Sequence, residues 1–169
     1  MPVLSRLLAH DAWTTRQLLL LAQPLTDAQL DQSFDLGLGT LRATFRHVIR
    51  NMEAWTDLMN GAPIRPDGDA TIDGLLHRLD VVAPQLAACA TGLAQAGRLD
   101  DRWIDPAETP PVERTFGGTI AHVITHSMHH RAQLLFMLRR LGVPNVPEGD
   151  VLSWEAHQQD SAKTPPPGA

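Results

Sequence analysis

Residues 118–141 read GTIAHVITHSMHHRAQLLFMLRRL and contain four of the eight histidines of the chain. An α-helix advances about 100° and about 1.5 Å per residue, so residues three or four positions apart share a face. On such a helix, one stripe of apolar residues lies within about 60° of Ile120: Val123, Ile124, Leu134, Leu135, Leu138 and Leu141. Gly142 and Pro144 then provide a stop signal. The stretch therefore predicts an amphipathic helix that packs against other helices.

Three more segments show helical spacing of apolar residues, namely residues 3–23, 40–60 and 71–97. The first ends before Pro24, because a residue that precedes proline avoids the helical conformation. Thr40 is suited to cap the start of the second segment, and Asn60-Gly61 to end it. Pro84 lies inside the third segment and predicts a kink or a break. Because almost no strand signal is present, we predict an all-α fold, a four-helix bundle.

The connections between these helices are long. Residues 24–39 join the first helix to the second, and residues 98–117, which contain Pro106, Pro110 and Pro111, join the third to the fourth. Connections of that length are usually functional or contain small elements of their own. They belong to one chain of 169 residues, which suits a single domain.

The C-terminal part of the sequence divides into two pieces. The segment 144–157, PNVPEGDVLSWEAH, is expected to pack back on the bundle through apolar residues: Val151, Leu152 and Trp154. Residues 158–169 end in KTPPPGA and are expected to form a short disordered tail. We therefore expect one domain over residues 1–157.

Composition excludes several classes of partner. The net charge is −5, whereas nucleic acids and anionic membranes attract basic surfaces, so neither is expected as a partner. The longest apolar run, residues 18–22, is far shorter than the roughly 20 residues of a membrane span. The first residues show no signal peptide. The single cysteine, Cys89, excludes an internal disulfide and is interpreted as a packing residue, which fits a cytoplasmic protein.

The clustered histidines are candidates for metal ligation. His126 and His130 are four positions apart, so one helix face presents both, but His122 and His126 have the same spacing. His130 falls at the edge of the apolar stripe and His126 about 40° further out, whereas His122 and His129 point towards solvent. A metal site in a bundle must face inward, and this favours the pair His126 and His130.

A third ligand is expected from a facing helix, because catalytic zinc is usually held by three protein ligands and a water. In residues 40–60, His47 lies on the flank between an apolar stripe and a charged side, much as His130 does on its own helix. A lone histidine at such a position is more often an ordinary surface or core residue. From spacing alone, a three-histidine site and a solvated histidine-rich patch both remain open.

Two segments of the sequence resemble the DinB family, including its YfiT-like members. The first is HVITHSMHHRAQLLFMLRRLGV, residues 122–143, similar to the family segment H-x3-H-x2-H-H-R-G-Q. The second is GTLRATFRHVIRNMEAW, residues 39–55. The resemblance extends from AHDAWTTRQLLLLA to PEGDVLSWEAH and so covers nearly the whole chain. The chain has Ala132 where the family commonly has glycine.

The resemblance implies a fold, a metal centre and two classes of activity. It implies an up-up-down-down four-helix bundle that is often a homodimer. It also implies a nickel or zinc ion on one histidine of the second helix and two of the fourth, at positions that match His47, His126 and His130. Members are similar to metal-dependent hydrolases or to S-transferases that use a low-molecular-weight thiol such as bacillithiol or mycothiol, and many have no known activity.

A divalent ion on three imidazoles can activate water for hydrolysis or a thiol for transfer to a small electrophilic substrate. No protein nucleophile is needed, and Asp11, Asn51 and Arg131 are candidate helpers. Asp11 lies in the apolar stripe of its helix, where an internal hydrogen bond is the preferred interpretation. Asn51 is one turn from His47, and Arg131 could bind a substrate carboxylate or pair with Asp11 or Glu53.

The alternative is a non-catalytic stress-response or binding protein with a structural or vestigial metal. Other metal and nucleotide motifs are absent from the sequence: there is no Glu-x-x-His pair, no H-E-x-x-H and no P-loop.

Overall fold

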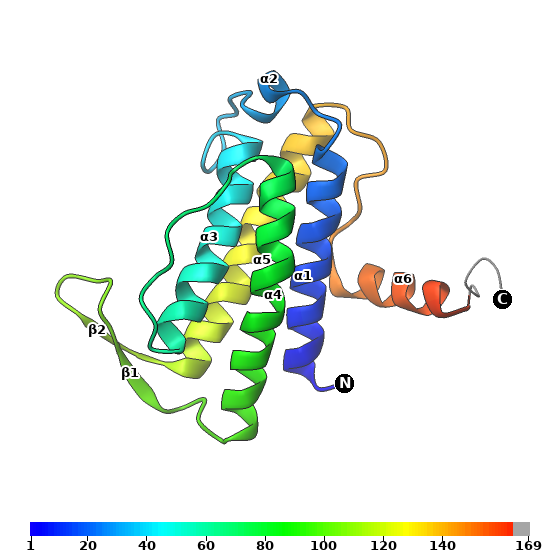
Figure 1. Cartoon of the computed structure of the whole chain (residues 1–169). Helices are drawn as coiled ribbons and strands as arrows, with labels where there is room; N and C mark the ends of the chain where they lie inside the picture. Colours follow the sequence, from blue (N-terminus) through cyan, green and yellow to red (C-terminus); the bar gives the residue numbers. More distant parts are fainter. Residues whose placement is uncertain (164–169) are drawn as a thin grey trace.

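The computed structural model describes the backbone of residues 1–163, and side chains up to residue 160. Four long helices make up most of it: α1 (Val3–Ala22), α3 (Leu41–Met59), α4 (Ile72–Gln95) and α5 (Phe116–Arg140). Figure 1 shows them side by side, with the short helix α2 (Asp27–Leu30) at one end. A hairpin of β1 (Arg102–Asp105) and β2 (Val112–Thr115) lies at the other end, and α6 (Val151–Lys163) follows α5. The described residues are therefore mostly helical, with one small antiparallel sheet.

Local sequence signals determine where the helices begin. The hydroxyl of Thr40 accepts a hydrogen bond from the backbone N–H of Ala43, which confirms the predicted cap of α3. Thr71 and Thr115 cap α4 and α5 in the same way. Helix α4 continues through Pro84, so the predicted break is absent.

Contacts between the helices establish their directions. Arg16 of α1 pairs with Asp80 of α4, and Gln23, at the end of α1, donates a hydrogen bond to Asp73, earlier in α4, so these helices are antiparallel. On α3 and α4, Glu53 contacts Arg78, and the later residues Thr56 and Cys89 line one pocket, so this pair is parallel. On α3 and α5, His47 contacts His126, and the later Trp55 contacts the earlier His122, so this pair is antiparallel.

The order of directions along the chain is therefore up-down-down-up, and the expected up-up-down-down order is wrong. The reason is the connection 60–71, which runs along the length of the molecule and brings α4 back to the end where α3 begins (Figure 1). Fully extended, it spans about 40 Å, more than the length of about 28 Å of the 19-residue α3.

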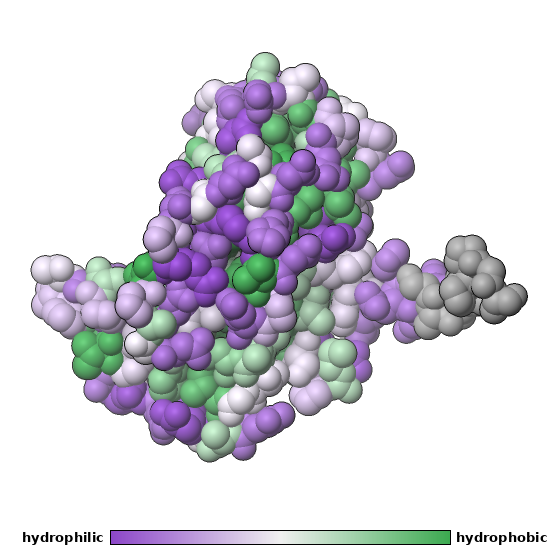
Figure 2. Space-filling view, viewed as in Figure 1, coloured by the Kyte–Doolittle hydropathy of each residue, from purple (hydrophilic) through white to green (hydrophobic). Residues whose placement is uncertain are grey.

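The four long helices enclose one hydrophobic core. Its largest fully buried side chains come from all four of them: Leu18, Leu19, Leu41, Phe45, Val48, Ile49, Met52, Leu75, Leu79, Leu134, Met137 and Leu138. On the face in Figure 2, hydrophilic residues predominate and hydrophobic ones form separate small areas. Among residues 1–163, no helix is both long and apolar enough to cross a membrane.

Three expectations for the connections and the C-terminus need correction. The connection 98–117 contains the β1–β2 hairpin, where almost no strand had been expected, because its four-residue strands are largely polar. Residues 158–163, assigned to a tail, continue α6, and residues 164–169 lie outside the described part. Trp154 is buried against the bundle, as expected, but Leu152 is 77% exposed.

Candidate metal centre

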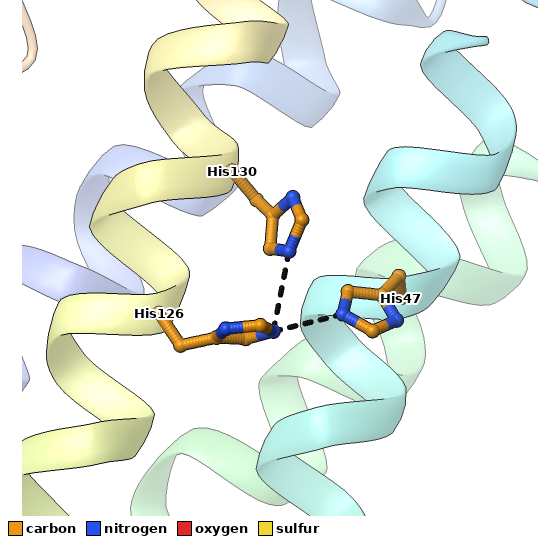
Figure 3. A group of neighbouring side chains, drawn as sticks. All are labelled: His47, His126 and His130. Atoms are coloured by element: carbon orange, nitrogen blue, oxygen red, sulfur yellow. Dashed lines mark hydrogen bonds between the residues drawn. The ribbon is translucent and has the colours of Figure 1, made fainter. Parts of the chain in front are cut away.

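Helices α3 and α5 bring the imidazoles of His47, His126 and His130 together (Figure 3). The Nε2 atom of His126 lies 2.8 Å from Nε2 of His47 and 3.2 Å from Nε2 of His130. One nitrogen of each ring lies within 4.8 Å of the other two. Three ring nitrogens from two helices thus face one point, as the sequence spacing and the family resemblance predicted.

The donor set fits a divalent ion. Two nitrogens each about 2.1 Å from one ion lie about 3.0–3.4 Å apart at angles of about 90–110°, which is close to the two separations between His126 and its neighbours. Hydrogen bonds between the rings cannot account for both contacts. A ring nitrogen has either one proton or one lone pair in the plane of the ring, so Nε2 of His126 can form only one linear hydrogen bond.

The protonation states of His47 and His126 and the tautomer of His130 suit ligation. Burial, and then the nearby charge of the other histidines, lowers the pKa of His126 to about 4. Burial and the proximity of His130 also lower the pKa of His47. The Nδ1–H of buried His130 donates to Oε1 of Gln133 at 2.9 Å, so in the neutral ring the inward Nε2 is bare. At neutral pH the rings of His47 and His126 are therefore uncharged and can present lone pairs.

The other two histidines of the cluster lie outside this group. His122 and His129 are exposed, as their positions on the helix predicted. The ring of His122 stacks on that of His126, with centroids 5.0 Å apart, and its other neighbour is Trp55. His129 accepts a hydrogen bond from the side-chain amide of Gln133 at 3.0 Å. Both rings therefore surround the group without joining it.

Clefts lie beside His122, which stacks on His126, and beside His47. One has a volume of about 440 Å³ and is lined by Trp55, His122 and residues of β2, including Arg114. The guanidinium of Arg114 lies 5.4 Å over the Trp55 ring, which places the hairpin at the rim of this cleft. The other, of about 340 Å³, is lined by His47 with Arg46 and others. Small molecules thus have space beside His47 and beside His122.

Two of the candidate helpers are paired with each other instead of facing these clefts. Arg131 forms an ion pair with Asp11 across α5 and α1, and the two side chains are only 3% and 2% exposed. Of the alternatives that the sequence left open for Arg131, the structure contains the internal ion pair, and the partner is Asp11. Burial lowers the pKa of Arg131 to about 10, which still leaves it charged at neutral pH.

Asn51 and Gln133 differ from the sequence-based expectation. Asn51 was the candidate partner of His47, but among the described residues its buried Oδ1 accepts no hydrogen bond. Gln133 was not singled out, although it contacts both His129 and His130. Its position three residues after His130 is the signal that could have identified it, since such residues share a helix face.

Comparison with known proteins adds a family assignment to this geometry. No curated protein matches the sequence. The model of the DinB family matches residues 1–162, almost the whole chain. The protein therefore belongs to the DinB family, and its three convergent histidines are the ones that the resemblance to that family indicated.

Proposed function

We propose that His47, His126 and His130 hold a divalent metal ion, zinc or nickel, in a DinB-type four-helix bundle. The observation that carries this proposal is the convergence of three Nε2 atoms from α3 and α5. Imidazole suits both metals, and three protein ligands leave positions open for a further ligand. An open site is the form used in catalysis, whereas structural zinc sites are usually closed by four protein ligands.

We further propose that the protein is a metal-dependent hydrolase or a thiol S-transferase that acts on a small electrophilic substrate. Such an ion supplies Lewis acidity and lowers the pKa of water or of a thiol, so that either becomes a nucleophile near pH 7. Burial lowers the pKa values of His47 and His126 and so favours their neutral, metal-binding form. The 440 Å³ cleft beside His122 offers a binding space, with the Trp55 ring as an apolar wall.

Metal titration of protein purified without a histidine tag tests the site. Zinc and nickel should bind to the wild type with one ion per chain, and His126→Ala should bind far more weakly. His77→Ala is the matched control, because His77 is exposed on α4, away from the three ligands. If the wild type fails to bind either metal, or if His126→Ala binds as well as the wild type, the metal centre is overturned.

Activity assays then separate the catalytic proposal from its alternative, a binding or stress-response protein with a structural metal. The wild type, metal-free protein and His126→Ala are compared against electrophiles with water or low-molecular-weight thiols as the nucleophile. Turnover that requires both the metal and His126 supports an enzyme. Metal binding that raises thermal stability without turnover on any substrate supports the structural alternative.

We also propose a homodimer that uses the outer face of α5. Met128 and Phe136 are 56% and 48% exposed on this helix, which also presents Ala121, Thr125 and Ala132 to solvent. Large apolar side chains gathered on one exposed helix face are typical of interfaces.

A further inference from the structure

Gln133 connects a metal-ligand candidate to a surface histidine. Its side chain is only 9% exposed, so both ends of its amide need hydrogen-bond partners. Oε1 accepts from Nδ1–H of His130 at 2.9 Å, and Nε2 donates to His129 at 3.0 Å. The amide therefore joins two imidazoles that are adjacent in sequence but differ in exposure.

The orientation of this amide determines which nitrogen of His130 faces the other two ligands as a lone pair. With Oε1 towards His130, Nδ1 must carry the proton, so Nε2 of the neutral ring is free to bind an ion. With the amide reversed, its N–H would donate to Nδ1, and the proton would move to Nε2. Nε2 of His130 lies 3.2 Å from Nε2 of His126, inside the ligand group, and once protonated it could not bind an ion.

The backbone of the connection between α1 and α3 lies close to the same amide. Gly37 has a φ of +55°, and a Cβ added there would lie 2.6 Å from Cδ and 2.7 Å from Nε2 of Gln133. Distances under 3.0 Å require something to move, and the flexible glutamine side chain is the part that gives way. Gly37 thus allows the backbone to close over the amide and to hold it against His130.

We propose that Gln133 is the positioning residue of the metal centre, holding His130 in the Nδ1–H tautomer while Gly37 holds the amide in place. This inference rests on the proposed function, because it assigns a role towards the proposed ion. Hydrogen-bond partners of metal-binding histidines fix the tautomer and the ring orientation, and their loss typically costs 10–100-fold in affinity. Gln133 does not contact the ion, and it acts only through His130.

Two substitutions at position 133 distinguish a role of Gln133 in orienting His130 from a role in filling space. Gln133→Met keeps the volume but removes the acceptor, so its zinc affinity should fall about 10–100-fold. Gln133→Glu keeps an acceptor for Nδ1–H, so its affinity should equal or exceed that of the wild type. If Gln133 merely fills space, the zinc affinities of the two variants should have the reverse order, because methionine packs well and a buried carboxylate does not. Gln95→Met, at an exposed position of α4, controls for the substitution itself.

A pair of glycine variants tests the same idea without altering either partner of the hydrogen bond. Gly37→Ala should displace the Gln133 amide and lower zinc affinity. Gly39→Ala is the matched control, since its φ of +85° imposes similar backbone strain while the nearest atom to the added Cβ is 3.9 Å away. Equal zinc affinity in the two glycine variants would overturn the role of Gly37.

Nitrogen-15 spectra of the imidazoles in metal-free protein provide a readout that is independent of metal binding. Wild type and Gln133→Glu should show the proton of His130 on Nδ1, and Gln133→Met should lose this preference. If the wild type shows the proton on Nε2, or if Gln133→Met keeps both the tautomer and the affinity, the inference fails by itself. If the wild type has the expected tautomer but binds no zinc, the proposed function fails instead.

Discussion

Replacing Arg131 with methionine tests the buried ion pair between α1 and α5. The substitution keeps an apolar stem but leaves the Asp11 carboxylate, only 2% exposed, without its counter-charge. Removal of one partner of a buried pair costs about 3–5 kcal/mol. Each kcal/mol lowers the Tm of a domain of this size by about 2–4 °C, so we expect a fall of about 6–20 °C.

Urea denaturation followed by circular dichroism measures the loss in free energy of unfolding. Arg16→Met is the matched control, because the pair of Arg16 with Asp80 is exposed and should contribute less than about 1 kcal/mol. The double variant Asp11→Leu with Arg131→Met should be more stable than Arg131→Met alone, since it buries no unpaired charge. The reasoning is refuted if Arg131→Met matches Arg16→Met, or if the double variant is the least stable of the set.

Three further predictions concern stability, pH and assembly. Arg78→Met should lower the free energy of unfolding in urea by about 3 kcal/mol, because it leaves the buried Glu53 carboxylate without its two hydrogen bonds. Burial lowers the pKa of His10, so protonation of its ring favours the unfolded chain. The stability that the neutral ring contributes is therefore complete above the unfolded pKa of about 6.5 and is lost as the pH falls below that value. Acidification should therefore loosen α6 and change the fluorescence of Trp154, whose ring contacts His10. Phe136→Glu should convert the proposed homodimer to a monomer in analytical ultracentrifugation.

Each of these predictions has a matched control. Arg98→Met removes an exposed pair with Asp101, and it should leave stability unchanged within about 1 kcal/mol. In His10→Gln an amide can still donate to the Gly149 carbonyl but does not titrate, so a fluorescence change that persists in this variant would contradict the assignment to His10. Leu152→Glu introduces the same charge as Phe136→Glu at an exposed position of α6, and this variant should remain a dimer. A wild-type monomer would refute the interface.

Helix positions could be predicted from the sequence because their signals are local. Pro24, the Thr40 cap and Gly142 each act on the backbone within a few residues, and all three helix boundaries are within two residues of the expected ones. The order of helix directions could not be predicted in this way. It depends on the connection 60–71, whose path along the molecule is stabilised by contacts with distant residues such as the pair of Asp67 with Arg78.

In the candidate site, too, features within one helix could be predicted, whereas contacts between helices could not. His126 and His130 share one helix, so spacing and the apolar stripe distinguished them from His122 and His129. His47 lies on another helix, and only the family resemblance raised it above an ordinary histidine. The pairing of Asp11 with Arg131 remained one of several alternatives, because no periodicity specifies how α1 is rotated against α5.

The separation of the three histidines along the chain would link metal binding to folding. His47 and His126 are 79 positions apart, so an ion held by all three histidines closes a loop that contains the whole of α4 and the hairpin. A permanent cross-link of that length would restrict the unfolded chain by about 4–5 kcal/mol in the chain-entropy model. With a single cysteine, the chain can form no internal disulfide of its own. The ion would thus be a reversible cross-link. It would form only when α3 and α5 pack together, and it would be lost when they separate.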